Sequence, residues 1–225
     1  LIEESKQSYN EIIKKSTILN DSKAKEIKTV GANMQKAVEA YMASVNKSSL
    51  ISNFAWEFNL IKDDSVNAWC MPGGKVAFYT GILPYTLDET GIATVMGHEI
   101  AHAIANHGNE RLSQSVLLNF GYSVLEEFKN ENPTKFREVL YQSFGIGSTL
   151  GSLKFSRVQE LEADKLGLIF MAMAGYDPSK SVDFWNRMSK SGSANIEILS
   201  THPNDAKRIS KIKAFLPEAL KYYKK

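Results

Sequence analysis

The chain has 225 residues, of which 43% are hydrophobic and 23% are charged, and its formal net charge is +2. This length supports one sizeable core or at most two small ones, and the nearly balanced charge argues against a nucleic-acid-binding surface. No run of eighteen apolar residues occurs, so we expect no membrane-spanning helix. The single cysteine, Cys70, cannot form an internal disulfide and is expected to be a small buried side chain.

The N-terminal part of the chain is expected to be helical. Apolar residues at helical spacing predict helices over residues 3–19 and 22–43, and a strand follows near residues 54–61. No internal repeat and no interdomain linker is found in the sequence. We therefore predict a single domain, in which N-terminal helices of residues 1–50 pack on a core of residues 51–225.

A short hairpin is predicted after this strand. Pro72-Gly73-Gly74 suits a type II turn, in which proline fixes the first corner and glycine allows a positive φ at the second. The flanking residues 67–71 and 75–80 have the composition of short strands.

The most informative stretch is His98-Glu99-Ile100-Ala101-His102. Apolar spacing predicts one helix over residues 88–107, and Thr86 with Glu89 three residues later fits a capping box. Positions i and i+4 of a helix lie about 40° apart around its axis, so both imidazoles leave the same face. This is the H-E-x-x-H pattern of zinc peptidases, in which Glu99 can reach a metal-bound water as general base.

The third metal ligand is not expected to be His107. It would lie nine residues after His98, on roughly the opposite face of the same helix, and the following Gly108 is typical of a helix end. The metzincin pattern also fails, because it needs a histidine at position 108. The alternative, buried core histidines without metal, is disfavoured because all four histidines fall in or near the candidate site.

A second helix, running from residue 157 to residue 175, offers a better ligand. Glu160 and Asp164 share a face at i, i+4, so Glu160 can face the metal while Asp164 accepts a hydrogen bond from a ligand imidazole. Glu162 is rotated about 200° from Glu160 and is expected to face solvent or to pair with Arg157. The alternative is that these acids only complement the helix dipole.

These elements resemble the gluzincin metallopeptidases of the CAAX prenyl endopeptidase and HtpX type. That family combines H-E-x-x-H, here residues 98–102, with a later E-x-x-A-D helix, here residues 160–164. Three further segments are similar in order: the N-A…P-G-G hairpin at 67–76, the A-G-Y-D-P turn at 174–178 and the T-H-P element at 200–203. The resemblance covers about residues 65–210.

The resemblance implies three ligands for one Zn²⁺ per chain: His98, His102 and Glu160. It implies Glu99 as the general base and acid, and Asp164 as the residue that orients a ligand.

The resemblance also implies that His202 is an active-site histidine. It would either stabilise the developing oxyanion or occupy the fourth zinc position in a resting state. Independently, a histidine before Pro203 can be an ordinary turn residue at a helix start. Arg208 is expected either to support this region electrostatically or to be a charge on an amphipathic helix.

Two segments are candidates for contact with substrate. In zincins an edge strand beside the metal pairs with extended substrate, and we assign this role to Gly73, Gly74, Lys75 and Val76, with an ordinary hairpin as the alternative. Residues 108–155 are predicted to be helical around 116–128 and 135–144, with glycines after them. They are expected either to gate the cleft or to complete the core. A helix to about residue 189 and a basic helix from residue 204 end the chain.

The predicted fold is α+β, mostly α: a single zincin-like domain over residues 1–225 with a small sheet beside the active-site helix. The expected function is zinc-dependent endopeptidase, with protein or peptide substrates, in particular unfolded or misassembled proteins. A zinc hydrolase of non-peptide bonds, and a chaperone-like or latent zinc protein with its site blocked by His202, are the alternatives.

The chain resembles a soluble, stand-alone member of the family, and from the soluble members and the missing start we expect it in the bacterial cell envelope or periplasm. A role in protein quality control there is implied by the resemblance alone. The chain starts at Leu1 and not at methionine. We therefore expect that a signal peptide, a lipidated leader that would anchor the protein, or an expression tag has been removed.

Overall fold

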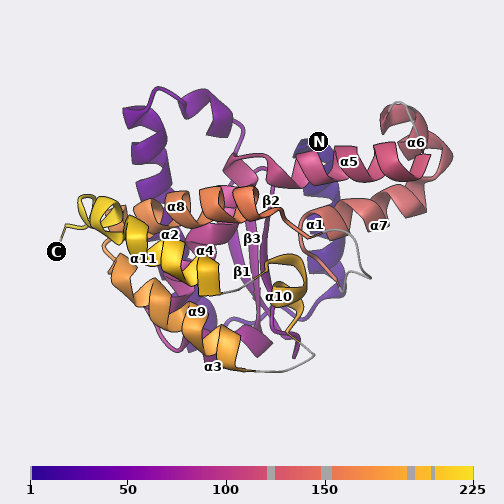
Figure 1. Cartoon of the computed structure of the whole chain (residues 1–225). Helices are drawn as coiled ribbons and strands as arrows, with labels where there is room; N and C mark the ends of the chain where they lie inside the picture. Colours follow the sequence, from indigo (N-terminus) through magenta and orange to yellow (C-terminus); the bar gives the residue numbers. More distant parts are fainter. Residues whose placement is uncertain (1, 121–124, 148–153, 192–195, 204–205, 225) are drawn as a thin grey trace.

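The computed structural model describes residues 2–120, 125–147, 154–191, 196–203 and 206–224. The predicted class is confirmed, because helices surround one three-stranded sheet (Figure 1). Among the described residues, no helix is both long and apolar enough to cross a membrane.

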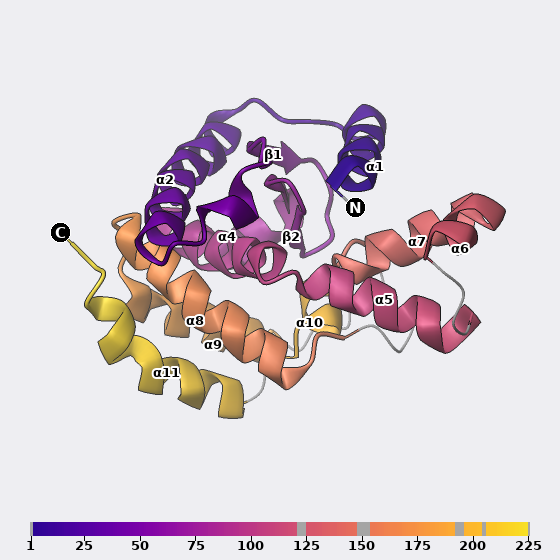
Figure 2. The ribbon, with the colours of Figure 1, turned by 90° about the horizontal axis from the view of Figure 1, so that it is seen from above.

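Two helices open the chain, and Figure 2 shows them on either side of the sheet. They are α1 (Ile2–Lys15) and α2 (Ser22–Ser44). The Asp21 side chain accepts a hydrogen bond from the backbone of Ala24 and so caps α2. The first helix ends earlier than residue 19, because Leu19 donates its backbone N–H to Leu60 in the sheet.

The sheet has the order β1-β3-β2, and the predicted hairpin is confirmed. Its strands are β1 (Glu57–Ile61), β2 (Ala68–Met71) and β3 (Lys75–Tyr79). Gly73 has φ 90°, as the second corner of the predicted turn requires. The central strand β3 runs antiparallel to β2 and parallel to β1. The outer edge of β1 is partly paired with the segment around Ile18, whereas the outer edge of β2 pairs with no described strand.

Successive side chains of the hairpin enter two different cores. Cys70, Val76 and Phe78 pack against α2 and the helix of residues 89–104, whereas Trp69 and Ala77 pack toward α1 and the helices between residues 107 and 143. This alternation is the period-two geometry of a strand. Because both faces of the sheet are buried in packed cores, the sheet is rigid, and it supports the elements that pack beside it.

The helix that carries residues 98–102 is α4 (Glu89–Ile104), and its ends differ from the prediction. Asp88, and not Thr86, is the N-cap, because its side chain accepts a hydrogen bond from the Gly91 N–H at 2.9 Å. Thr86 instead ends the short helix α3 (Leu83–Thr86), which follows a 3₁₀ turn (Thr80–Ile82). At the other end Asn106 adopts φ 63°, which stops α4 before residue 107.

The helices between the one that carries residues 98–102 and the one that carries residues 160–164 form an arm that extends away from the C-terminal helix (Figure 2). They are α5 (His107–Phe120), α6 (Leu125–Glu131) and α7 (Pro133–Ser143). The predicted helix over 116–128 overlaps the end of α5 and the start of α6. Residues 121–124 and 148–153, which include Gly151, lie outside the described residues.

The helix that carries residues 160–164, α8 (Arg157–Met173), starts with a capping box between Ser156 and Gln159. The chain then continues through a 3₁₀ turn (Pro178–Lys180), α9 (Ser181–Lys190), α10 (Glu197–Thr201) and α11 (Ala206–Leu220). The short α10 was not predicted. A further 3₁₀ turn (Ser48–Ile51) follows α2.

Candidate active site

The two ligand-bearing helices meet at a pair of glycines. A Cβ on Gly97 would lie 2.7 Å from the Gly167 carbonyl oxygen, and one on Gly167 would lie 2.8 Å from the His98 backbone nitrogen. No side chain separates the backbones of α4 and α8 at this point. Because the two helices approach so closely, His98 and His102 of α4 and Glu160 of α8 can face one common point.

We expect Gly97→Ala to destabilise the protein by about 1–3 kcal/mol, because a methyl group must force α4 and α8 apart. The same displacement separates the ligands that the helices carry, so zinc affinity should fall as well. Urea denaturation and competition with a zinc chelator measure the two effects. Thr90→Ala, at a half-buried position of the same helix, is the control, and equal stability of the two variants would contradict the role of the glycine contact.

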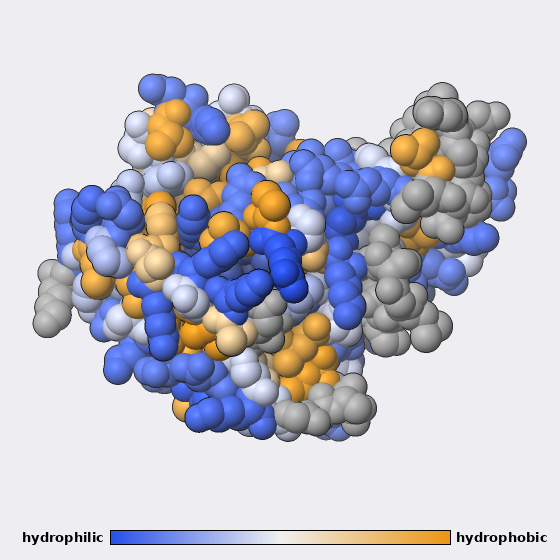
Figure 3. Space-filling view, in the orientation of Figure 1, coloured by the Kyte–Doolittle hydropathy of each residue, from blue (hydrophilic) through white to orange (hydrophobic). Residues whose placement is uncertain are grey.

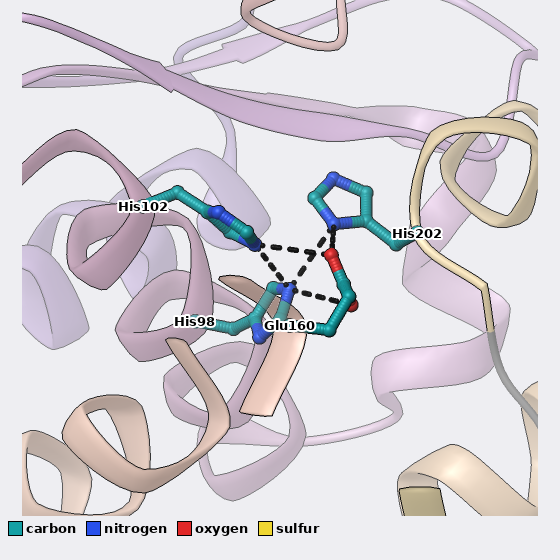
Figure 4. A group of neighbouring side chains, drawn as sticks. All are labelled: His98, His102, Glu160 and His202. Carbon is teal, nitrogen blue, oxygen red and sulfur yellow. Dashed lines mark hydrogen bonds and ion pairs between the residues drawn. The ribbon is translucent and has the colours of Figure 1, made fainter. Parts of the chain in front are cut away.

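Four side chains converge on one point (Figure 4). They are His98 and His102 of α4, Glu160 of α8, and His202 directly after α10. The His98 Nε2 atom lies 3.1 Å from His102 Nε2 and 3.2 Å from His202 Nδ1. The Glu160 Oε1 atom lies 3.2 Å from His102 Nε2 and 2.7 Å from His202 Nδ1.

These separations match a tetrahedral zinc site. Ligand bonds of 2.0–2.1 Å imply donor–donor distances of roughly 3.3 Å in a tetrahedron. Three imidazole nitrogens this close in a buried site repel one another through lone pairs or protons unless a cation lies between them. The donor set, three imidazoles and a carboxylate, is one that Zn²⁺ prefers, so the residues fit this ion.

Electrostatics keep two of these groups in the form that binds metal. Burial and the neighbouring His98 lower the pKa of His102 well below its usual value, so its imidazole is neutral. Burial alone would raise the pKa of Glu160, but Arg208 and the nearby histidines hold it well below its usual range. The carboxylate is therefore ionised.

Asp164 lies where helical spacing predicted it. Its Oδ1 atom is 3.0 Å from His98 Nδ1, on the side of the ring away from the donor cluster. This contact fixes the ring orientation and the tautomer of His98. Although burial opposes ionisation, Arg208 lowers the pKa of Asp164, so it accepts the hydrogen bond as a carboxylate.

Arg208 is buried, with 7% of its surface exposed, and it connects both carboxylates of α8. It donates from Nε and Nη2 to Asp164 at 2.8 and 2.7 Å, and its Nη1 lies 2.7 Å from Glu160 Oε2. The guanidinium also lies 3.8 Å above the Trp185 ring. Of the two readings of Arg208, electrostatic support is the one that these contacts favour. Arg208 lies four residues before the buried Ile212, on the same face of α11, so the sequence already indicated that Arg208 faces the core.

His107 is outside the donor cluster, as predicted, but the reason differs. It starts α5 after the turn at Asn106, and this turn brings its Nδ1 within 2.9 Å of His102 Nδ1. Its Nε2 lies 3.2 Å from Glu162, whose side chain is 54% exposed and pairs with His107. His107 thus holds the ring of His102 as Asp164 holds that of His98.

Glu99 is 3% exposed and lies next to the donor cluster. Its Oε1 atom is 3.6 Å from His202 Nε2 and has no hydrogen-bond partner among the described residues. Burial raises the pKa of Glu99 above its usual value, against the opposing effect of His202 and His98. A buried carboxylate oxygen with an open hydrogen-bonding position is suited to exchange a proton with a reacting molecule.

Phe155 covers the donor cluster and was not predicted. Its ring centroid lies 4.0 Å from that of His102 and 4.7 Å from that of His202. The Arg111 guanidinium of α5 lies 3.8 Å from the centroid of the Phe155 ring, and the Phe155 N–H donates to the Thr201 carbonyl at 2.9 Å. Both ends of the segment 108–155 therefore border the site.

The assignment of substrate pairing to Gly73, Gly74, Lys75 and Val76 requires correction. Lys75 and Val76 belong to the central strand, whose backbone pairs with β1 and β2. The carbonyls of Gly73 and Gly74 accept hydrogen bonds from Ala55 and Glu57. The open edge on the hairpin side of the sheet belongs to β2, which packs on α4.

The fold and the site together define a gluzincin-type metallopeptidase, with two histidines on one helix and a glutamate on a later one. The chain belongs to peptidase family M48, which matches residues 31–216.

Named relatives support this family. The mitochondrial metalloendopeptidase OMA1 of Saccharomyces cerevisiae is 37% identical over 205 residues, which cover 84% of this chain and 55% of the yeast protein. The human metalloendopeptidase OMA1 is 33% identical over 83% of this chain and 37% of its own length. The β-barrel assembly-enhancing protease of Escherichia coli is 27% identical over 69% of this chain and 33% of its own length.

The chain thus spans about half of the yeast relative and about a third of the other two. The zinc metallopeptidase family is confirmed. The relatives described here carry the names OMA1 and β-barrel assembly-enhancing protease, so the resemblance holds for the family and not specifically for its CAAX prenyl endopeptidase and HtpX type.

Proposed function

We propose that this chain is a zinc-dependent endopeptidase that cleaves unfolded or misassembled proteins. The observation that carries the proposal is the buried set of four donor atoms at tetrahedral spacing, with the Glu99 carboxylate beside it. Membership of family M48 supports the same reaction. A closed structural zinc site has no use for an adjacent base, so Glu99 favours a catalytic role over a structural one.

In the proposed mechanism His98, His102 and Glu160 hold the ion. When bound, Zn²⁺ supplies Lewis acidity to the scissile carbonyl and lowers the pKa of the attacking water. Glu99 takes the proton of that water at Oε1 and returns it to the leaving amine. Asp164 and His107 keep the two ligand rings in place during this cycle, since each contacts the Nδ1 atom of one ring.

We propose that the conformation described here is a resting state. The His202 Nδ1 atom lies within the donor set, whereas a peptidase site needs one open position. The stacking of Phe155 on His202 and the hydrogen bond to Thr201 support the closed arrangement. Catalysis then requires His202 to leave the cluster, and the protein would be latent until it does.

His202→Ala should raise kcat/KM for a short peptide by at least about threefold, because a larger fraction of molecules would have the open site. Zinc should remain at one per chain, held by the other three ligands. If His202 instead stabilises the oxyanion, the same substitution should lower kcat by about 10²–10³-fold. Ser200→Ala is the matched control, since it is a half-buried position of α10 outside the donor set and should not activate the protein.

Hydrolysis of unfolded casein tests the peptidase assignment. We expect zinc-loaded protein to cleave casein, the chelated protein to be inactive, and one equivalent of Zn²⁺ to restore cleavage. Cleavage of model esters without any cleavage of casein would favour a hydrolase of non-peptide bonds. Stoichiometric zinc with no hydrolysis by either the wild type or His202→Ala would favour a chaperone-like protein.

The biological role proposed is protein quality control at a cell envelope or an organelle membrane. Relatives named for mitochondria and for β-barrel assembly support this setting. Fractionation of cells that express the full-length protein with an epitope tag tests the location. Recovery in the cytosolic fraction alone would contradict it.

A further inference from the structure

A pocket of about 280 Å³ lies between the start of α8 and the first half of α11, and it shares Glu160 with the donor cluster. The residues that matter for its chemistry are Arg157, Glu160, Pro203, Lys207, Arg208 and Lys211. In Figure 3 strongly hydrophilic side chains gather at the centre of the visible face, where Figure 1 shows the starts of α8 and α11. We call this cavity the α8–α11 pocket.

The charges that line the α8–α11 pocket are mainly positive. Its one described carboxylate, Glu160, is already paired with Arg208 at 2.7 Å. Lys207 and Lys211 are exposed and stand at i, i+4 on α11, where like charges repel each other unless an anion lies between them. The first described turn of α11 contains no acidic residue. The walls therefore concentrate a positive potential inside the pocket.

The size and position of the pocket limit what it can bind. Its volume of about 280 Å³ is close to the lower end of the range for drug-sized ligands, about 300–1,000 Å³, so the pocket has room for a side chain or a chain end. Glu160 forms part of its lining with one carboxylate oxygen near Arg208, while the other oxygen contacts His102 and His202. Pro203, directly after His202, forms another part of the lining. Only the Glu160 side chain therefore lies between a group bound in the pocket and the three histidines of the donor cluster.

We propose that the α8–α11 pocket binds a carboxylate of the peptide substrate. The protein then prefers an acidic side chain, or a free C-terminus, within a few residues of the scissile bond. The inference rests on the proposed peptidase function only for the identity of the ligand, because the anion site itself is defined by the exposed Lys207 and Lys211. A small free carboxylate would bind through the same charges. The experiment must therefore distinguish a carboxylate of a peptide from a free one.

Binding without hydrolysis tests this proposal. Zinc-loaded Glu99→Gln protein, which retains every lining residue, is titrated with a fluorescent decapeptide that contains one central glutamate. A second peptide with glutamine at that position and an amidated C-terminus serves as the neutral comparison. We expect the acidic peptide to bind about fivefold to tenfold more tightly, and Lys207→Gln with Lys211→Gln to remove this difference. Lys190→Gln with Lys213→Gln removes the same charge from exposed positions outside the pocket and should leave the difference intact.

Equal affinity for the two peptides, no saturable binding of either peptide, or the same loss in the control variant would overturn the proposal. Pocket-dependent binding of glutarate, with no discrimination between the peptides, would also overturn it, because the ligand would then be a free carboxylate. Failure of the peptidase function is recognised separately, as absence of casein cleavage by the wild type. The binding comparison does not depend on that reaction.

Discussion

Replacing Glu99 with glutamine should lower kcat/KM for peptide hydrolysis by about 10²–10⁴-fold while zinc stays at one equivalent per chain. Glutamine keeps the shape of the side chain but cannot take a proton from water. Glu99 is not one of the four donor side chains, so the ion should be retained. Peptide cleavage, followed by mass spectrometry, and metal analysis of the same sample measure the two quantities.

Glu89→Gln is the matched control for this prediction, since it is the same substitution at an exposed position of the same helix. Activity of the control should stay within about twofold of the wild type, as is usual for surface changes. If Glu99→Gln retained most of its activity, Glu99 would not be the base. A loss of zinc together with activity would instead mean that Glu99 supports the metal site.

The parts of the site that local periodicity determines were predictable from the sequence. The spacing of His98 and His102 on one helix, and of Glu160 and Asp164 on another, follows from 3.6 residues per turn. Placing both pairs at one centre required the resemblance to a known family, because no local rule brings together residues about sixty positions apart. The structure adds the physical reason, which is the glycine contact between α4 and α8.

The contacts that depend on turns and on long-range pairing were not predictable in the same way. His107 was placed on the far face of a continuous helix, but one residue with positive φ, Asn106, turns the chain and directs His107 at His102. The strand order was equally hidden, because the parallel pairing of β1 with β3 has no signature in the hairpin sequence. For that reason the predicted pairing edge included Lys75 and Val76, which the structure places in the central strand.

Arg208→Met should destabilise the metal-free protein by about 3–5 kcal/mol, the usual cost of leaving buried charges without their partner. Two carboxylates, Glu160 and Asp164, would lose their cation in a region that excludes water. Bound Zn²⁺ replaces part of the lost positive charge, so the variant should be less destabilised with zinc than without it. Urea denaturation of chelated and zinc-loaded protein provides the comparison.

Two further variants separate charge from geometry at this position. Arg208→Lys keeps the charge but loses the planar fork that contacts both oxygens of Asp164, so an intermediate loss of stability is expected. Arg187→Met removes a half-buried arginine that donates to the Tyr85 carbonyl and serves as the control. If Arg208→Met cost no more than this control, the two carboxylates would have to be neutralised by other groups. Arg208 would then not be the residue that keeps Glu160 ready to bind metal.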